Sequence, residues 1–176
     1  MELEKYLKRK DAAFAYADAA QVVFDPSFRA LCERNACGYY GKCWMCPPDV
    51  GPVGELIEKA KSYRRVLVFQ SVHKIEDSFD IEGMHEAAVR HNRLARGVRK
   101  TLQKNGRADC LVLGAGACGG CRTCAKQKGE PCRSPEKAVI SLEACGVDAA
   151  ALMKLAGLQS GGGENMVVYL GAVFFN

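Results

Sequence analysis

Hydrophobic positions recur along the chain with two periods, one typical of strands and one typical of helices. Residues 12–17 alternate as a half-buried strand does, and residues 65–71, 110–113 and 166–175 form apolar runs that favour buried strands. A short helix is expected before the first strand, and the glycines at 161–163 predict a turn before the last one. The pattern therefore predicts four strands with other elements between them.

The clearest helical period covers residues 84–107. Apolar side chains fall on one half of this helix and basic side chains on the other, and Asn105-Gly106 predicts its end. We interpret the basic half as a solvated face, with docking of an acidic redox partner as the alternative. Its members are Arg90, Arg93, Arg96, Arg99, Lys100, Lys104 and Arg107.

Strands and helices alternate along most of the sequence. Shorter helices are expected over residues 53–62, from Ser134-Pro135 as N-cap and first turn, and from Asp148 to Gly157. This order predicts an α/β (or α+β) fold with a small sheet flanked by helices. A chain of 176 residues fits a single domain, here residues 1–176, and can bury a substantial core without cross-links. Metal is therefore not needed merely to form a core.

Ten cysteines are the unusual feature of the composition. The first residues, MELEKYLKRK, lack the apolar run of a secretory signal, and no later segment reaches the roughly 18 apolar residues of a membrane span. We therefore expect a cytoplasmic protein with no membrane partner, whose cysteines are metal ligands or redox groups rather than disulfides. The formal charge of +5 counts each cysteine as neutral, whereas metal-bound cysteines are thiolates. A nucleic-acid partner is therefore not expected from the charge.

The strongest motif lies in a Gly- and Cys-rich segment, residues 114–133, which is expected to be an irregular loop. Three thiols at two-residue intervals can curl around one four-iron, four-sulfur cluster, because the glycines between them let the backbone turn sharply. A fourth thiol slightly further along closes the site. These cofactor-binding candidates are Cys118, Cys121, Cys124 and Cys132. A zinc site made by the same four thiols is the competing interpretation, and a solvated basic loop without metal is the third.

A second irregular loop is expected over residues 32–52. It carries four more candidate metal ligands within fifteen residues, namely Cys32, Cys37, Cys43 and Cys46. Pro47-Pro48 stiffens this segment, and Trp44 with its neighbouring tyrosines is suited to shield a site from water. The pair Cys43-Trp-Met-Cys46 has chelating spacing, which favours a closed site of four thiols. One or two clusters are thus expected in all, with zinc as the alternative.

The two loops together carry a family resemblance. The first has Cys, Cys, Tyr-Gly-Lys and Cys-Pro-Pro in order, and the second has Cys-x2-Cys-x2-Cys followed by Glu-Pro-Cys-Arg-x-Pro and by Ser-Leu-Glu-Ala-Cys-Gly-Val-Asp. Over about residues 22–158 the chain resembles the prokaryotic family of predicted metal-binding proteins, domain of unknown function 2284. The resemblance implies metal binding but no established reaction. The ligands that it implies are Cys32, Cys37, Cys46, Cys118, Cys121, Cys124 and Cys132, so Cys43 departs from the family pattern.

Other chemistry-bearing residues have structural interpretations. Cys110 and Cys145 are expected to be small buried side chains, and His91 to be a core or boundary histidine on the apolar face of its helix. The glycines at 114–119 match a dinucleotide-binding fingerprint, but a cysteine run follows them instead of the required helix. We find no pairing of nucleophile and base that predicts catalysis.

Three functions follow from this reading. The leading one is an iron-sulfur protein that passes electrons to a redox protein partner or senses redox state. A zinc-stabilised adaptor that binds another protein or nucleic acid is the second, and an enzyme with an incompletely ligated cluster is the third. The sequence makes no prediction of the oligomeric state.

Overall fold

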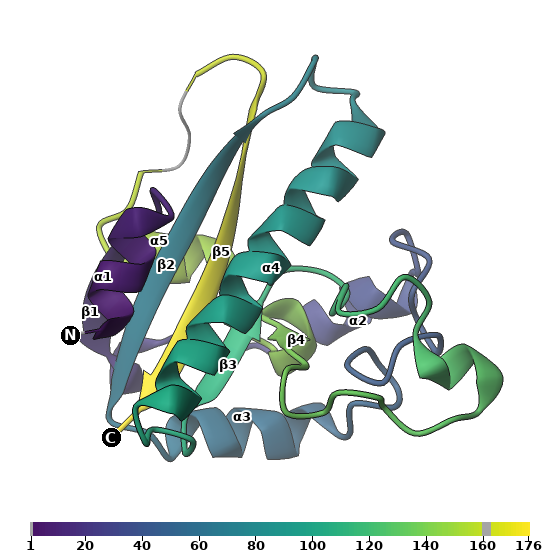
Figure 1. Ribbon diagram of the computed structural model, residues 1–176, viewed down its shortest axis with the longest axis horizontal. Coiled ribbons are helices and arrows are strands. Elements are labelled where there is room, and N and C mark those ends of the chain that lie inside the picture. Colours follow the sequence, from purple (N-terminus) through teal and green to yellow (C-terminus); the bar gives the residue numbers. More distant parts are fainter. Residues whose placement is uncertain (1, 160–162) are drawn as a thin grey trace.

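A five-stranded sheet with helices on both faces forms the framework of the computed structural model, which describes residues 2–159 and 163–176 (Figure 1). The strand order across the sheet is β1-β2-β5-β3-β4. The β3–β4 pair is parallel and the other pairs are antiparallel. The predicted α/β class is confirmed. The strands are β1 (Ala13–Asp18), β2 (Arg65–Lys74), β3 (Leu111–Gly114), β4 (Ile140–Ser141) and β5 (Met166–Phe175).

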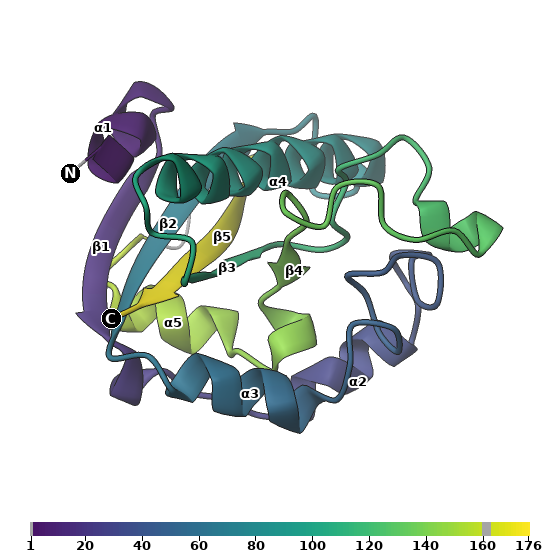
Figure 2. The ribbon, with the colours of Figure 1, turned by 60° about the horizontal axis from the view of Figure 1, so that its bottom comes forward.

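Helices cover the two faces of this sheet, which explains why β2 and β5 read as continuous apolar runs. Figure 2 shows α4 and α1 on one face and α3 and α5 on the other. Successive residues of a strand point to opposite faces, so Leu67 and Phe69 pack in the cluster with α4 and α1, while Val66 and Val68 pack in the cluster with α3 and α5. The helices are α1 (Glu2–Arg9), α2 (Phe28–Glu33), α3 (Val53–Lys61), α4 (Ile81–Lys104) and α5 (Ala149–Leu155).

Strand β5 lies in the middle of the sheet and carries a glycine at its tightest point. A Cβ atom on Gly171 would lie 2.2 Å from the ring of Phe69 and 2.8 Å from the carbonyl oxygen of Leu113. Because β5 pairs with both β2 and β3, these two contacts come from its two neighbouring strands. The aromatic ring therefore occupies the space that a side chain would take.

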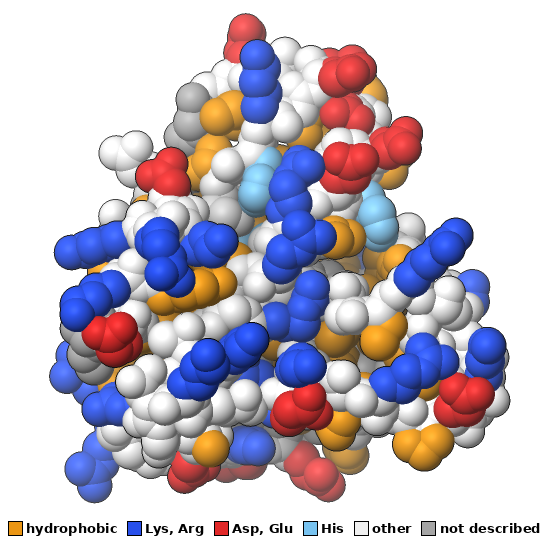
Figure 3. All heavy atoms as spheres, in the orientation of Figure 1, with side chains coloured by type: hydrophobic (Ala, Val, Ile, Leu, Met, Phe, Trp, Pro, Cys, Tyr) orange, Lys and Arg blue, Asp and Glu red, His pale blue; other side chains and the backbone are white. Residues whose placement is uncertain are grey.

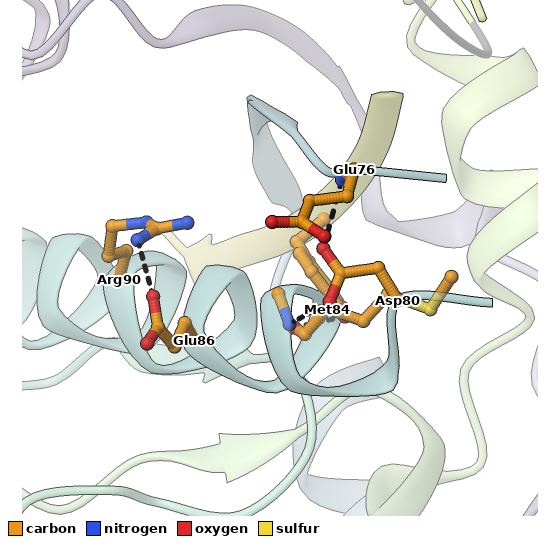
Figure 4. Close-up of polar contacts among 7 residues, drawn as sticks. Glu76, Asp80, Met84, Glu86 and Arg90 are labelled. Carbon is orange, nitrogen blue, oxygen red and sulfur yellow. Dashed lines mark hydrogen bonds and ion pairs between the residues drawn. The ribbon is translucent and has the colours of Figure 1, made fainter. Parts of the chain in front are cut away.

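Helix α4 begins three residues before the predicted start, because Asp80 caps it. Figure 4 shows the Asp80 side chain at the first turn, where Oδ1 accepts from the Gly83 N–H at 2.7 Å and Oδ2 accepts from the Glu76 N–H at 3.0 Å. The helix ends at Lys104, next to the predicted stop at Asn105. Asp148 caps α5 as predicted, by accepting from the Ala151 N–H.

Two local predictions are wrong. Ser134-Pro135 begins a single turn rather than a helix, because the chain must reach the buried Val139 and the start of β4 within a few residues. Cys32 lies in α2 and not in the irregular loop, which begins after that helix. The predicted turn at 161–163 falls mostly outside the described residues. Among the described helices, none is both long and apolar enough to cross a membrane.

Candidate metal centre

The two cysteine loops lie side by side beyond the β3–β4 end of the sheet (Figures 1 and 2). We call residues 34–52 the first loop and residues 115–133 the second loop. The indole Nε1 of Trp44 donates to the carbonyl oxygen of Glu130 at 2.9 Å. Lys126 forms an ion pair with Asp49, and its Nζ lies 4.4 Å from the centroid of the Trp44 ring. Segments that are distant in sequence are thus held together by side chains from both.

Helix α4 fixes the start of the second loop. The amide of Asn92, which is 1% exposed, donates to the carbonyl oxygens of Ala115 and Ala117 at 2.5 Å each and accepts from the Ala115 N–H at 2.9 Å. One turn later, Arg96 donates to the carbonyl oxygen of Cys118. These contacts set the direction in which the backbone enters the cysteine run.

The basic half of α4 is therefore only partly the solvated face that the sequence favours. Arg96 holds the second loop, and Arg99 donates to the carbonyl oxygen of Ala138 just beyond it. That prediction is wrong for these two arginines, because each is long enough to reach a loop carbonyl while its aliphatic part packs on the helix. Arg93 and Lys100 remain exposed.

The Cys43 sulfur is the point where the two loops meet. It takes part in hydrogen bonds with the thiols of Cys46 and Cys124 and with the backbone N–H groups of Met45 and Cys118. The hydrogen bond from Cys46 is the main cause that lowers the pKa of Cys43 to about 6. The pKa of Cys46 is raised by the same hydrogen bond and by burial. One sulfur of this pair is thus prepared to be a thiolate, which is the form that binds metal.

The cysteines face two separate hollows. One, of about 190 Å³, is lined by both loops and contains the four predicted thiols of the second loop together with one from the first. The other, of about 320 Å³, is lined by one thiol of α2, by the two remaining thiols of the first loop, and by Ser141, Glu143 and Tyr169. The first set is Cys43, Cys118, Cys121, Cys124 and Cys132, and the second is Cys32, Cys37 and Cys46. The structure therefore divides the eight predicted thiols as five and three rather than four and four.

The chemistry of these donor sets fits a thiolate-bound metal. Soft sulfur ligands suit zinc and iron-sulfur clusters, and burial favours retention of either. Cys43 and Cys46 are 4% and 8% exposed, whereas Cys37 and Cys121 lie at the surface. Within residues 2–159 and 163–176, no three side chains of His, Cys, Asp or Glu converge on one point as they would around a single ion.

The remaining candidates lie elsewhere. Cys145 is fully buried in the core on the α5 side, where burial raises its pKa to about 12, and Cys110 is half-buried beside the core on the α4 side. His91 is fully buried and hydrogen-bonded to Ser71, as a core histidine should be. These structural interpretations are supported by the burial of each side chain.

Sequence reasoning missed the residues that hold the loops in place. Asn92 gave no clear signal, because at 100° per residue it falls between Arg99 and Arg96, on the basic half of the helix. The contacts of Trp44 with Glu130 and of Lys126 with Asp49 had none, because no local pattern encodes a meeting between distant loops.

Comparisons with known proteins agree with the two-loop resemblance. No significant match was found among curated proteins or among solved structures. A family model with the description "Predicted metal-binding protein (DUF2284)" matches residues 16–175, nearly the whole chain. With both cysteine loops inside the matched range, the chain belongs to this family of predicted metal-binding proteins.

Proposed function

We propose that this chain is an iron-sulfur protein of electron transfer or redox sensing, in which Cys118, Cys121, Cys124 and Cys132 hold a four-iron, four-sulfur cluster. The observation that supports this most is that all four thiols line one hollow of about 190 Å³ between the loops. A cluster bound there would supply reversible one-electron transfer. A redox protein is then the expected partner.

Electrostatics around the second loop support the same function. Arg133 lies against the thiol of Cys121 and forms an ion pair with Glu130 at 3.1 Å. Arg96, Arg122 and Lys137 also line the hollow. Positive charge beside thiolates favours their deprotonated form and offsets the negative charge of an all-thiolate cluster.

The first loop supplies a cover for this hollow. Tyr39, Trp44 and Met45 of this loop line it together with the second loop's cysteines. Apolar and aromatic cover limits the access of water, which influences both the reduction potential and the survival of a cluster in air. Zinc held by the same thiols, in an adaptor protein, is the competing function.

Replacing Cys121 by Ser is expected to remove about four iron and four sulfide per chain, one cluster's worth, from protein purified without oxygen. Iron and acid-labile sulfide are measured together with zinc and the visible absorbance spectrum. The matched control is Cys110→Ser, which changes a half-buried cysteine that lines neither hollow. Unchanged metal in Cys121→Ser would exclude this thiol from the site. A colourless wild-type protein with stoichiometric zinc would replace the cluster proposal with the adaptor.

A second candidate, an enzyme, is favoured by the three-thiol hollow. Cys32, Cys37 and Cys46 line it together with Glu143 and Tyr169, while Cys43 faces the other hollow. Three protein ligands leave one coordination position of a bound metal or cluster open to a substrate. The sequence favoured a closed four-thiol site that includes Cys43, and the ligand set of the first loop stays a prediction.

The open three-thiol site and the closed four-thiol site can be distinguished in a Cys121→Ser background, in which only metal bound by the first loop is expected to remain. Adding Cys46→Ser is expected to remove that metal, whereas adding Cys43→Ser is expected to leave it in place. The measurement is metal per chain after gel filtration, with the single Cys121→Ser variant as reference. Equal loss in both double variants would establish a closed first-loop site and would rule out the open position on which the enzyme depends.

A further inference from the structure

A serine hydroxyl lies between two imidazoles, one from β2 and one from α4. Ser71 Oγ is 2.9 Å from Nε2 of His73 and 2.7 Å from Nδ1 of His91. A hydroxyl has one proton, so Ser71 donates to one of these ring nitrogens and accepts from the other. Its position is therefore fixed from both sides.

One end of this chain of hydrogen bonds is buried and the other reaches the surface. His91 is 0% exposed, and desolvation lowers its pKa to about 4, so it is neutral near pH 7. Its ring also stacks on Phe69 with centroids 5.5 Å apart. Ser71 and His73, by contrast, both line a hollow of about 250 Å³. A hydrogen-bonded serine and histidine are thus held in place at the wall of an accessible space.

Three elements contribute to that hollow, and three of its lining residues are cations. Tyr6 and Lys10 come from α1 and its end, Ser71 and His73 from β2, and Arg90, Arg93 and Leu94 from α4. No residue of this lining is shared with either cysteine hollow. The site therefore has a lining of its own, and its nearest connection to the three-thiol hollow is Tyr169, whose ring lies next to both imidazoles.

The cations are only partly neutralised. Figure 4 shows Glu86 directed along α4 towards Arg90, with which it pairs at 3.2 Å. In the part of the chain that the structure describes, neither Lys10 nor Arg93 has a side-chain hydrogen bond or an ion pair. Figure 3 shows many Lys and Arg side chains spread over the face of the molecule that carries α4. Three cations and one carboxylate leave the hollow with a net charge of about +2.

We propose that this hollow binds the phosphate group of a small phosphorylated molecule. A phosphate monoester is close to a dianion at neutral pH, which matches the charge of the rim. Guanidinium groups bind phosphate oxygens through paired hydrogen bonds, and Lys10 adds a point charge. When Ser71 donates to Nε2 of His73, the Nδ1–H of His73 is left to donate to a phosphate oxygen. Ser71, whose one proton is then used, contributes by holding that ring in place without a further conformational cost.

The apolar part of the lining favours an ester over free phosphate. Leu94 is buried at the base, and Tyr6 packs across the helix with its hydroxyl where a Cβ of Gly97 would otherwise lie. These two side chains offer a surface to the carbon portion of a ligand. An unsubstituted phosphate ion would leave that surface uncovered.

The test is calorimetric titration of the whole protein with inorganic phosphate and with phenyl phosphate, at constant ionic strength and with acetate as the comparison anion. Both phosphates are expected to bind, with phenyl phosphate at least threefold tighter, and acetate at least tenfold weaker than either. Arg93→Gln is expected to weaken the binding of phenyl phosphate at least tenfold, and Ser71→Ala is expected to weaken it severalfold. Lys100→Gln, an exposed cation on the same helix, should change the affinity less than twofold.

Equal affinity for acetate and phosphate, or equal losses in Arg93→Gln and Lys100→Gln, would overturn the proposal, as would phosphate binding without phenyl phosphate binding. Metal content is measured on the same variants and should not change. The outcome is thus independent of whether the cysteine loops hold iron, zinc or neither. Circular dichroism identifies any variant that has lost its fold. Lys10→Gln then takes the place of that variant in the test, and it must itself weaken the binding of phenyl phosphate.

Discussion

Replacing Asn92 by Ala is expected to lower the free energy of unfolding of the metal-free protein by about 3 kcal/mol, because a buried N–H and two carbonyl oxygens lose their partner. Each unsatisfied buried group costs about 1–3 kcal/mol, and partial entry of water reduces the sum. Metal content should also fall, since Asn92 sets the backbone that leads to Cys118. Denaturant unfolding and metal analysis of the same preparations measure the two effects.

Asn105→Ala is the matched control for this prediction. Asn105 caps the same helix and donates one hydrogen bond, to the carbonyl oxygen of Thr101, but that contact is exposed. Its loss is expected to cost less than about 1 kcal/mol and to leave metal content unchanged. If the Asn92 and Asn105 variants were equally stable, the second loop would not depend on the amide of Asn92.

Gly171→Ala is the second substitution with a large expected effect, a destabilisation of about 3 kcal/mol. The added methyl group would overlap the Phe69 ring and the Leu113 carbonyl oxygen. The ring can turn, but the carbonyl belongs to the β3 backbone that pairs with β5, so relief requires the strands to separate. Denaturant unfolding measures the change.

Two further variants identify overlap as the cause. Gly54→Ala adds a methyl group in the first turn of α3, where no atom lies within 4 Å, and should be neutral or stabilising by less than about 1 kcal/mol. Combining Gly171→Ala with Phe69→Leu should cost less than the sum of the two single changes, because the smaller side chain frees part of the space. Strict additivity would show that the ring of Phe69 is not what Gly171 accommodates.

Periodicity predicted those parts of the fold that local sequence determines. The strand at Met166–Phe175 begins and ends where its apolar run does, since both faces of β5 are covered by helices. The start of α4 was placed too late because Asp80 caps the helix before its amphipathic pattern begins. At Ser134, a good capping residue is followed by a chain that tertiary contacts draw into β4. Local preference was overridden there by packing.

Spacing within each loop singled out eight thiols as candidate ligands, because chelation by neighbouring residues is a local property, and their role as ligands stays a prediction. How the folded chain groups these thiols was not predictable. Spacing also placed Cys43 with Cys46, and their sulfurs do share a hydrogen bond. The contact of Cys43 with Cys124 lies between loops, and only the folded chain brings the two residues together. Likewise, only the folded chain brings Asn92 to the second loop and assembles the hollow around Ser71.

The position of β5 in the sheet has a consequence for the order of events during synthesis. Among the described strands, β5 follows every other one in the sequence, yet it lies between β2 and β3 and joins the β1–β2 pair to the β3–β4 pair in the sheet. Translation therefore delivers all the thiols of both loops before the strand that joins the two halves is available. If these thiols bind metal as proposed, a folded site becomes available to it only after β5 has joined the two halves of the sheet.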